Sequence, residues 1–336
     1  MLQARAMFPD EALLEDALSQ PSKPLTALMR RLDGDLLVAG VGGKMGADLA
    51  RLAVRASGGK RRVYGVARFT KKVLRRELER AGVRTIACDL LDPDAVSRLP
   101  AAPNVVFMAG RKFGTGGQES LTWATNALAP AYVARQYRKS RIVAFSTGCV
   151  YPLVPAFSKG SSVKDPPAPK GEYAASCLAR ERVFEHASRT WGTKVALIRL
   201  NYANDLRYGV LHDIGRWVLE GKPVPLRVPT FNAIWQGEAN EAALRALPRC
   251  SSPPAVLNVT GAERVSVRAT ALAFGMLLGK KVRFEGKEGP VAYLSRTSMK
   301  PRVPVKAMIE WTAEWLACGN PSLDLPTHFE VSDGKY

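Results

Sequence analysis

Three regularly spaced glycines, Gly40, Gly43 and Gly46, form the stretch of this sequence best suited to binding a phosphate group. They follow a short apolar run at 36–39 and precede apolar residues at helical spacing, which predicts a strand, a tight turn and a helix. A side chain at Gly40 or Gly43 would keep the backbone away from a pyrophosphate, and Gly46 lets the helix pack closely on its strand. Because a helix N-terminus offers unpaired N–H groups, we predict an anion site here.

The composition is typical of a globular protein with room for one large α/β domain or two lobes. The chain has 336 residues, of which 46% are hydrophobic and 24% charged, and we find no apolar run of membrane-spanning length. Acids stand near the start, where a secretory signal would be apolar, so we expect a cytoplasmic protein. The widely spaced cysteines predict neither a disulfide framework nor a metal site. They are Cys88, Cys149, Cys177, Cys250 and Cys318.

The chain is strongly basic, with a formal net charge of +19. Such an excess can mark a nucleic-acid surface, above all between Lys60 and Arg84. Elsewhere the basic residues are scattered, and no recognised nucleic-acid motif accompanies them. We therefore expect a small-molecule substrate and neither nucleic acid nor a membrane as partner.

Alternating strand and helix patterns from residue 34 onward predict an α/β fold with a doubly wound parallel sheet. The expected strands are 36–39, 62–67, 85–88, 105–109, 141–146 and 194–200, and the expected helices are about 70–81, 119–138 and 173–189. Residues 1–33 read as one or two amphipathic helices separated by Lys23 and Pro24. This N-terminal helical extension could serve as a dimerisation arm, so a homodimer stays open.

The alternation loosens after residue 200, which divides the chain into a Rossmann domain at 34–200 and a mostly substrate-binding lobe at 201–336. This part contains a helix ending near Gly221 and further helices at about 236–247, 266–278 and 304–317. The strand expected at 255–260 belongs either to this lobe or to the main sheet. The lobe should lie over the carboxyl edge of the sheet, where ligands of such folds bind.

Further motifs follow the glycine loop in order along the chain: Asp89-Leu90 after the third strand, Ala109-Gly110 after the fourth, and Asn126 in the next helix. Together they resemble the extended short-chain dehydrogenase/reductase family of NAD(P)-dependent sugar epimerases and dehydratases, from about Gly34 to Leu316. The resemblance implies a Rossmann fold and an NAD(P) cofactor. It assigns to the cofactor Gly40, Gly42, Gly43, Lys44, Met45, Gly46, Asp89, Leu90, Ala109, Gly110 and Asn126.

The second strand ends in Ala67-Arg68 instead of an acid. An acid there would bind the adenosine ribose hydroxyls, whereas an arginine pairs with a 2′-phosphate. Arg68, assisted by Lys71 or Lys72, therefore favours NADP over NAD. The alternative is that these residues form a solvated basic face.

The segment from Ser146 to Tyr151 and the tyrosine that begins Tyr-Ala-Ala-Ser-Cys at Tyr173 resemble the catalytic motifs of the same family. The resemblance implies that Thr147 binds the reacting oxygen of the substrate. It also implies that Tyr173 is the acid/base and contacts the cofactor.

Cys177 stands where the family pattern Tyr-x-x-x-Lys has its lysine. In the family this lysine holds the nicotinamide ribose and lowers the tyrosine pKa, and a neutral thiol does neither. Three alternatives stay open: the oxidised cofactor activates Tyr173 alone, another cation takes over, or catalysis has been lost. Lys112 and Arg111, just after the fourth strand, are the candidate cations, and we take Lys112 as the third catalytic residue.

Three residues after the sixth strand are candidates for binding the substrate: Asn201, Arg207 and Trp235. Amides and an aromatic plane suit sugar hydroxyls and ring faces, and an arginine suits a carboxylate or phosphate, although Trp235 would equally suit a core. We expect an oxidoreductase or epimerase that transfers hydride on a carbohydrate or sugar-derived substrate. The alternative is a non-catalytic NAD(P)-binding sensor or scaffold.

Overall fold

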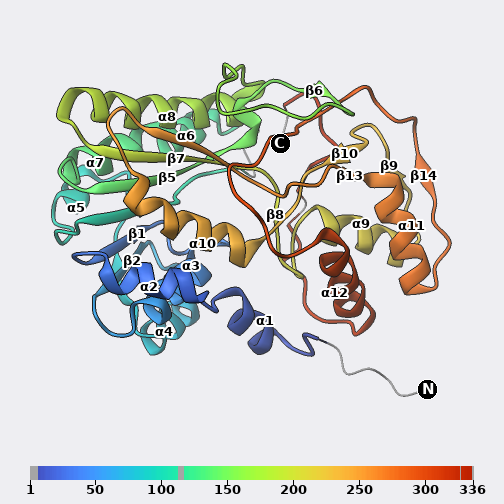
Figure 1. Cartoon of the computed structure of the whole chain (residues 1–336), viewed down its shortest axis with the longest axis horizontal. Coiled ribbons are helices and arrows are strands. Elements are labelled where there is room, and N and C mark those ends of the chain that lie inside the picture. The colour runs from blue at the N-terminus through green and yellow to red at the C-terminus, as the bar shows by residue number, and fades with distance from the viewer. Residues whose placement is uncertain (1–6, 113–116, 326, 335–336) are drawn as a thin grey trace.

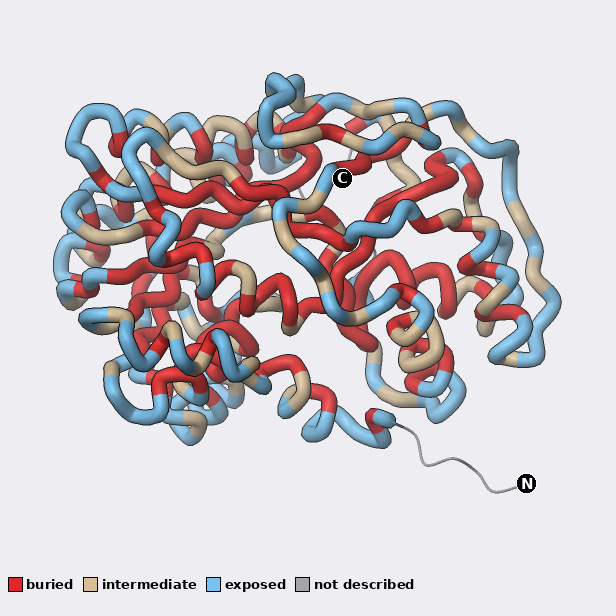
Figure 2. The backbone as a smooth tube through the Cα atoms, viewed as in Figure 1, coloured by how far each residue is buried: buried red, intermediate tan, exposed pale blue. Residues whose placement is uncertain are grey.

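The computed structural model of the chain describes residues 7–112, 117–325 and 327–334. Figure 1 shows a large sheet with helices on both sides and, beside it, a smaller lobe of helices and short strands. The buried residues run through the strands of the sheet and continue into the small lobe (Figure 2). The two parts therefore share a continuous interior.

The central sheet has seven parallel strands within the described residues, in the order β12-β7-β5-β4-β1-β2-β3. These strands are β1 (Leu36–Ala39), β2 (Val63–Ala67), β3 (Arg84–Ala87), β4 (Asn104–Phe107), β5 (Arg141–Thr147), β7 (Lys194–Leu200) and β12 (Ala255–Val259). The doubly wound parallel sheet is confirmed. Because β12 pairs with β7, the chain returns from the small lobe to the main sheet, a point that the sequence left open.

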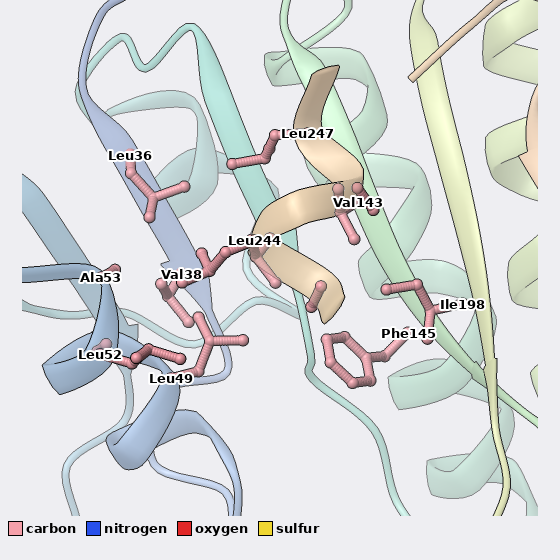
Figure 3. Packing of buried hydrophobic residues seen from close by; sticks show 14 of the residues in the cluster. Leu36, Val38, Leu49, Leu52, Ala53, Val143, Phe145, Ile198, Leu244 and Leu247 are labelled. Atoms are coloured by element: carbon pink, nitrogen blue, oxygen red, sulfur yellow. The ribbon is translucent and has the colours of Figure 1, made fainter. Parts of the chain in front are cut away.

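Each strand presents alternate residues to the two faces of the sheet. In β1, Leu36 and Val38 pack beneath α2 (Lys23–Arg31), α3 (Gly46–Ser57) and α10 (Gln236–Ala246). Figure 3 shows this face, where Leu244 of α10 and Leu247, which follows that helix, belong to the same cluster as Val143, Phe145 and Ile198. Leu37 and Ala39 pack on the other face against α5 (Pro93–Ser97), α7 (Ala129–Gln136) and α8 (Gly171–Trp191).

The small lobe is built from α9 (Val210–Leu219), α11 (Val267–Leu278) and α12 (Val305–Ala317) around a second apolar core. Two-residue strands pair around it, and they are too short to give a sequence signal. They are β6 (Val154–Pro155), β8 (Ala203–Asn204), β9 (Val224–Pro225), β10 (Thr230–Phe231), β11 (Ile234–Trp235), β13 (Val265–Ser266), β14 (Phe284–Glu285) and β15 (Val291–Ala292). Two further helices are α4 (Lys72–Arg80) and α6 (Glu119–Trp123).

The N-terminal helices pack onto the rest of the chain. The apolar side of α1 (Glu11–Leu18) is buried in the small-lobe core, and Leu25 and Met29 of α2 are buried beneath the sheet. Our expectation that Lys23 and Pro24 separate the two helices is wrong, because α2 begins at Lys23. Proline is tolerated in a first helical turn, where its missing N–H would have no partner within the helix.

No helix among the described residues is both long and apolar enough to cross a bilayer. Residues 7–112, 117–325 and 327–334 also contain no cluster of three or more His, Cys, Asp or Glu side chains that could hold a metal ion.

Candidate active site

The glycine loop lies between β1 and β4, where the strand order reverses. Gly40 has a φ of +94°, and a Cβ there would lie 2.5 Å from the backbone nitrogen of Ala109. A Cβ on Gly46 would lie 2.8 Å from the carbonyl oxygen of Gly40. Both positions therefore require glycine, for a left-handed turn and for the close packing of α3 on the loop. In open α/β sheets this reversal point is where ligands bind.

Helix α3 points its N-terminus into this loop. The residue before it, Met45, provides no side-chain cap, and no other side chain among the described residues caps its first turn. Gly42 and Gly43 are exposed beside it. Unpaired N–H groups behind an exposed glycine turn form a cradle that fits the phosphates of a dinucleotide.

The ends of β2 and β3 lie along the same edge. A Cβ on Gly42 would lie 3.2 Å from the Cβ of Ala67, so the loop borders the residue that precedes Arg68, whose side chain is exposed. Asp89 is exposed after β3 and accepts a hydrogen bond from the Leu91 N–H at 3.0 Å, and Leu90 is buried. The structure thus places Arg68 and Asp89 on the side of the sheet predicted for the adenosine.

Asn126 holds the turn after β4 in place. It is fully buried in a single π-helical turn, Ala124–Leu128. Its Oδ1 accepts from the Arg111 N–H at 2.8 Å, and its Nδ2 donates to the Arg111 carbonyl at 3.0 Å and to Ser176 Oγ at 2.9 Å. The amide is therefore used within the protein, and it fixes the loop of Gly110 and Arg111 against α8.

Thr147 and Tyr173 meet at the end of β5. Thr147 is buried, its hydroxyl accepts from the Cys149 N–H at 3.2 Å, and it shares a hydrogen bond with the Tyr173 hydroxyl. Tyr173 is also hydrogen-bonded to Cys177, one helical turn further along α8. Burial raises the pKa of Tyr173 well above its ordinary value of 10, and the thiols of Cys177 and Cys149 raise it further.

Lys112 reaches the same pocket from the β4 turn. Its Nζ donates to the carbonyl of Thr327 at 2.8 Å. Burial lowers the pKa of Lys112, whereas the nearby groups Cys149, Asp213, Glu330 and Cys177 raise it. The ammonium therefore lies within electrostatic range of the Cys177 thiol. The other candidate cation, Arg111, donates from Nη2 to Gln118 Oε1 at 2.7 Å, and the turn continues into residues 113–116, which lie outside the described part.

Arg180 is a functional candidate that our sequence analysis missed. It is 5% exposed and donates to the Phe145 carbonyl at 2.8 Å and to Asn126 Oδ1 at 2.6 Å. Its partners among the described residues are uncharged oxygens, and its positive charge lowers the pKa of both Tyr173 and Cys177. The sequence contained a signal for it, because Tyr173, Cys177 and Arg180 stand at positions i, i+4 and i+7, which share one face of a helix.

Asn201 lies beside the Thr147 segment. It follows β7, is buried, and its Cγ would lie 3.0 Å from a Cβ on Gly148. Its Nδ2 donates to the Tyr293 carbonyl at 3.1 Å. The structure therefore brings Asn201 next to the catalytic candidates, with its amide nitrogen already engaged.

Trp235 lies in the small-lobe core. It is 6% exposed, stacks on Phe8 with ring centroids 6.1 Å apart, and meets the edge of Trp311 at 5.5 Å. These contacts fit the alternative of a packing residue. The aromatic plane is covered by other aromatic side chains of the same core, so we do not carry Trp235 forward as a substrate residue.

A buried polar network surrounds Arg207. Arg207 pairs with Asp205 at 3.1 Å and with Glu11 at 3.2 Å, so its charge is neutralised within the protein and we do not carry it forward either. Gln236 Nε2 donates to Asp48 Oδ2 at 2.8 Å. Burial, reinforced by Asp205, raises the pKa of Asp48 to about 6.

Lys44 links the glycine loop to the small lobe. Its Nζ lies 3.5 Å from the centroid of the Tyr208 ring and 3.5 Å from the Ala203 carbonyl. Burial lowers the pKa of Lys44 to about 7, with Lys112 contributing in the same direction. The charge of Lys112 therefore acts on Lys44, so the two side chains lie within electrostatic range of each other.

Comparison with known proteins identifies the family. Residues 36–203 match the model of the "NAD dependent epimerase/dehydratase family", which spans half of the chain. The chain belongs to this family. The predicted resemblance to sugar epimerases and dehydratases, an enzyme class with an NAD(P) cofactor, is thereby confirmed. No curated protein matches the chain.

Solved structures of this epimerase/dehydratase fold align over most of the chain. The UDP-glucose 4-epimerase of Thermotoga maritima with UDP-glucose has 17% identity and a TM-score of 0.69, covering 84% of this chain and 98% of that one. The UDP-glucose 4-epimerase of Thermus thermophilus with NAD has 23% identity and a TM-score of 0.67, covering 83% and 98%. The UDP-glucuronic acid 4-epimerase of Bacillus cereus with NAD has 18% identity and a TM-score of 0.70, and the alignment covers 84% of this chain and 96% of that one. At these identities the likeness concerns the fold.

Proposed function

We propose that this protein is an NAD(P)-dependent oxidoreductase or epimerase that acts at a carbinol carbon of a sugar nucleotide. The observation that carries the proposal is the hydrogen-bonded pair of Thr147 and Tyr173, which lies at the same sheet edge as the glycine cradle. Structural neighbours whose titles name UDP-sugars support the substrate class. The dinucleotide, when bound, supplies the acceptor and donor of hydride.

The two hydroxyl groups have complementary roles. Tyr173 Oη accepts the proton of the substrate hydroxyl as that carbon is oxidised and returns it on reduction, while Thr147 Oγ1 orients the reacting oxygen. A proton can be accepted near neutral pH only if the phenol loses its own proton there. Since burial raises the pKa of Tyr173, the site needs positive charge nearby.

Two cations divide the work that the resemblance assigns to one lysine. Arg180 is buried behind Tyr173 and lowers the pKa of its phenol. Lys112 is partly exposed and lies within electrostatic range of Cys177, which supports a role in binding the nicotinamide ribose. Cys177 itself then needs to supply no charge.

The cofactor contacts follow from the geometry of the sheet edge. The backbone of residues 40–46 and the first turn of α3 would hold the pyrophosphate. Arg68, exposed beside the loop, would pair with a 2′-phosphate, which favours NADP. On the substrate side, Asn201 remains our candidate because it adjoins the Thr147 segment.

The proposal is tested by replacing the acid/base in the full-length chain. With a panel of UDP-sugars and both dinucleotides, we expect Tyr173→Phe to lower kcat by about 10²- to 10⁴-fold and to leave dinucleotide affinity within severalfold. Tyr137→Phe is the matched control, because Tyr137 is also a buried tyrosine and its hydroxyl donates to the Pro100 carbonyl at 2.9 Å. Equal kcat in Tyr173→Phe and the unmodified chain contradicts the assigned role. Tight dinucleotide binding without turnover of any sugar nucleotide favours the sensor or scaffold instead.

A further inference from the structure

The C-terminal segment Thr327–Gly334 bridges the two parts of the molecule. At its start, the backbone N–H and the hydroxyl of Thr327 both donate to Asp213 Oδ2 of α9, at 2.9 and 2.6 Å. Near its end, Lys170 Nζ donates to the Ser332 carbonyl at 3.1 Å, next to the start of α8.

Close packing fixes this segment in place. Phe329 is 1% exposed, and its ring centroid lies 5.8 Å from that of Trp217 and 6.1 Å from that of Phe231. Gly171, two residues before Tyr173, packs so tightly on Gly334 that neither glycine has room for a Cβ. The segment is therefore built into the fold at both ends.

The same segment provides the hydrogen-bond acceptor for Lys112. The Thr327 carbonyl accepts from Lys112 Nζ at 2.8 Å, while the N–H and hydroxyl of Thr327 are held by Asp213. Thr327 is 2% exposed and Asp213 is 9% exposed, so water competes little for these bonds. The ionisable groups of the described residues that act on Lys112 include Cys149, Cys177, Asp213, Glu330 and Lys44.

We propose that Asp213 and Thr327 are positioning residues that hold the Lys112 ammonium near Cys177, at the place proposed for the nicotinamide ribose, so that dinucleotide affinity depends on the docked C-terminal segment. This inference rests on the role proposed above for Lys112. The side chain of Asp213 fixes the threonine from the small lobe, and the threonine carbonyl fixes the lysine that follows β4. Through these contacts the small lobe would control a cofactor contact made by the Rossmann domain.

Linkage makes the inference testable without turnover. If docking of the segment strengthens dinucleotide binding, then the dinucleotide must strengthen docking by the same factor. Hydrogen exchange at the Phe329 amide and its neighbours reports docking, since this amide donates to Thr327 Oγ1 at 3.3 Å. We expect saturating NAD or NADP to slow exchange at residues 327–334.

The experiment compares dinucleotide affinity, by calorimetry, in four full-length variants. Thr327→Val removes the hydroxyl that Asp213 holds, and we expect a Kd raised about five- to tenfold. Lys112→Met should raise it at least as much, and Thr327→Ser should restore it. Thr312→Val is the matched control, because Thr312 is an equally buried threonine whose hydroxyl donates to the Met308 carbonyl within α12.

The outcomes separate this inference from the proposed function. Unchanged affinity in Thr327→Val with weakened binding in Lys112→Met overturns the positioning role and leaves the role of Lys112 intact. Unchanged affinity in both overturns the positioning role together with the assignment of Lys112, while the Tyr173 test still decides the chemistry. Faster exchange at 327–334 on dinucleotide binding also overturns it, because the segment would then compete with the cofactor.

Discussion

The glycine loop and the pocket around Tyr173 lie at the same edge of the sheet but are built differently. The loop depends on backbone shape: Gly40 and Gly46 have no room for a Cβ. The pocket depends on side-chain charge, and its cations come from separate segments, Arg180 on α8 and Lys112 after β4. A backbone cradle is specified within a few adjacent residues, whereas a charge can be supplied from any segment that reaches the site. The residues of the loop can therefore vary little, whereas the pocket can draw its charge from different segments.

The largest effect is expected from a methyl group in the loop. Gly40→Ala must adopt a φ of +94° and places its Cβ 2.5 Å from the Ala109 backbone, so we expect a loss of about 2–5 kcal/mol in the free energy of unfolding. Gly59→Ala is the control, because Gly59 also has a positive φ, of +77°, but nothing within 4 Å of its Cβ. Urea unfolding measures the loss of stability in both variants. The difference between the two losses gives the cost of the steric contact at residue 40, because the strain of a positive φ is common to both. Equal losses in the two variants would show that the loop is looser than described.

A large effect is also expected in the pocket, from removal of the Arg180 charge. Without it the pKa of Tyr173 rises, so the ascending limb of the kcat profile in the oxidising direction should move to higher pH in Arg180→Met. Arg180→Lys keeps the charge and should keep the profile near its original position, although it loses part of the bonding to Phe145 and Asn126.

The double variant Arg180→Met/Cys177→Lys sharpens this test. A lysine at position 177 restores a cation one turn from Tyr173, so the limb should return toward lower pH. If the pH profile of kcat is unchanged in both Arg180→Met and the double variant, another group sets the pKa of Tyr173. Spectroscopic titration of tyrosinate, with Tyr173→Phe as the reference, measures the same pKa without turnover.

Asp48 is a buried carboxyl group behind the glycine loop, and its ionisation should lower the free energy of unfolding. Its pKa is raised from 3.8 to about 6, so the folded state binds a proton that the unfolded state has lost between about pH 4 and 6. The free energy of unfolding therefore falls as pH rises through that window, and Asp48 accounts for about 2–3 kcal/mol of this fall. Asp48→Asn should flatten the decline in urea unfolding measured at pH 4, 5 and 6, and a decline of unchanged slope would contradict the assignment.

The smallest effect is expected for the preference between NADP and NAD, which we test by replacing Arg68 after β2. Arg68 is exposed, so solvent screens its pairing with a 2′-phosphate, and we expect Arg68→Asp to shift the ratio of NADP to NAD affinity by about tenfold toward NAD. Arg80→Asp, on the same basic surface at the far end of α4, controls for general charge. An equal shift in both variants would indicate a diffuse field instead of a specific contact.

Much of the fold was predictable because its information is local. Apolar runs marked the central strands, and β5 differs from the expected strand only by including Thr147. The two-residue strands of the small lobe could not be predicted, since pairing such as that of β8 with β11 depends on segments some thirty residues apart.

The candidate site was predictable in part. Glycine spacing indicated the loop, and the family pattern indicated Thr147 and Tyr173, which the structure brings together. The environments of Arg207 and Trp235 were not predictable, because Glu11 and Phe8, which contact them, lie about two hundred residues away in the chain. Arg180 could have been found from helical spacing alone.

The π-helical turn that contains Asn126 makes the side-chain directions in this helix depend on the number of residues in the turn. A π turn inserts one residue into an α-helix, which rotates everything after it by about 100°. Thr122 before the turn, Asn126 within it, and Ala129 and Val133 after it are all buried, so the helix keeps one buried face across the wider turn. Deleting one residue between 126 and 128 would rotate the residues after it by about 100°, and Asn126 and Val133 could not both keep their inward directions.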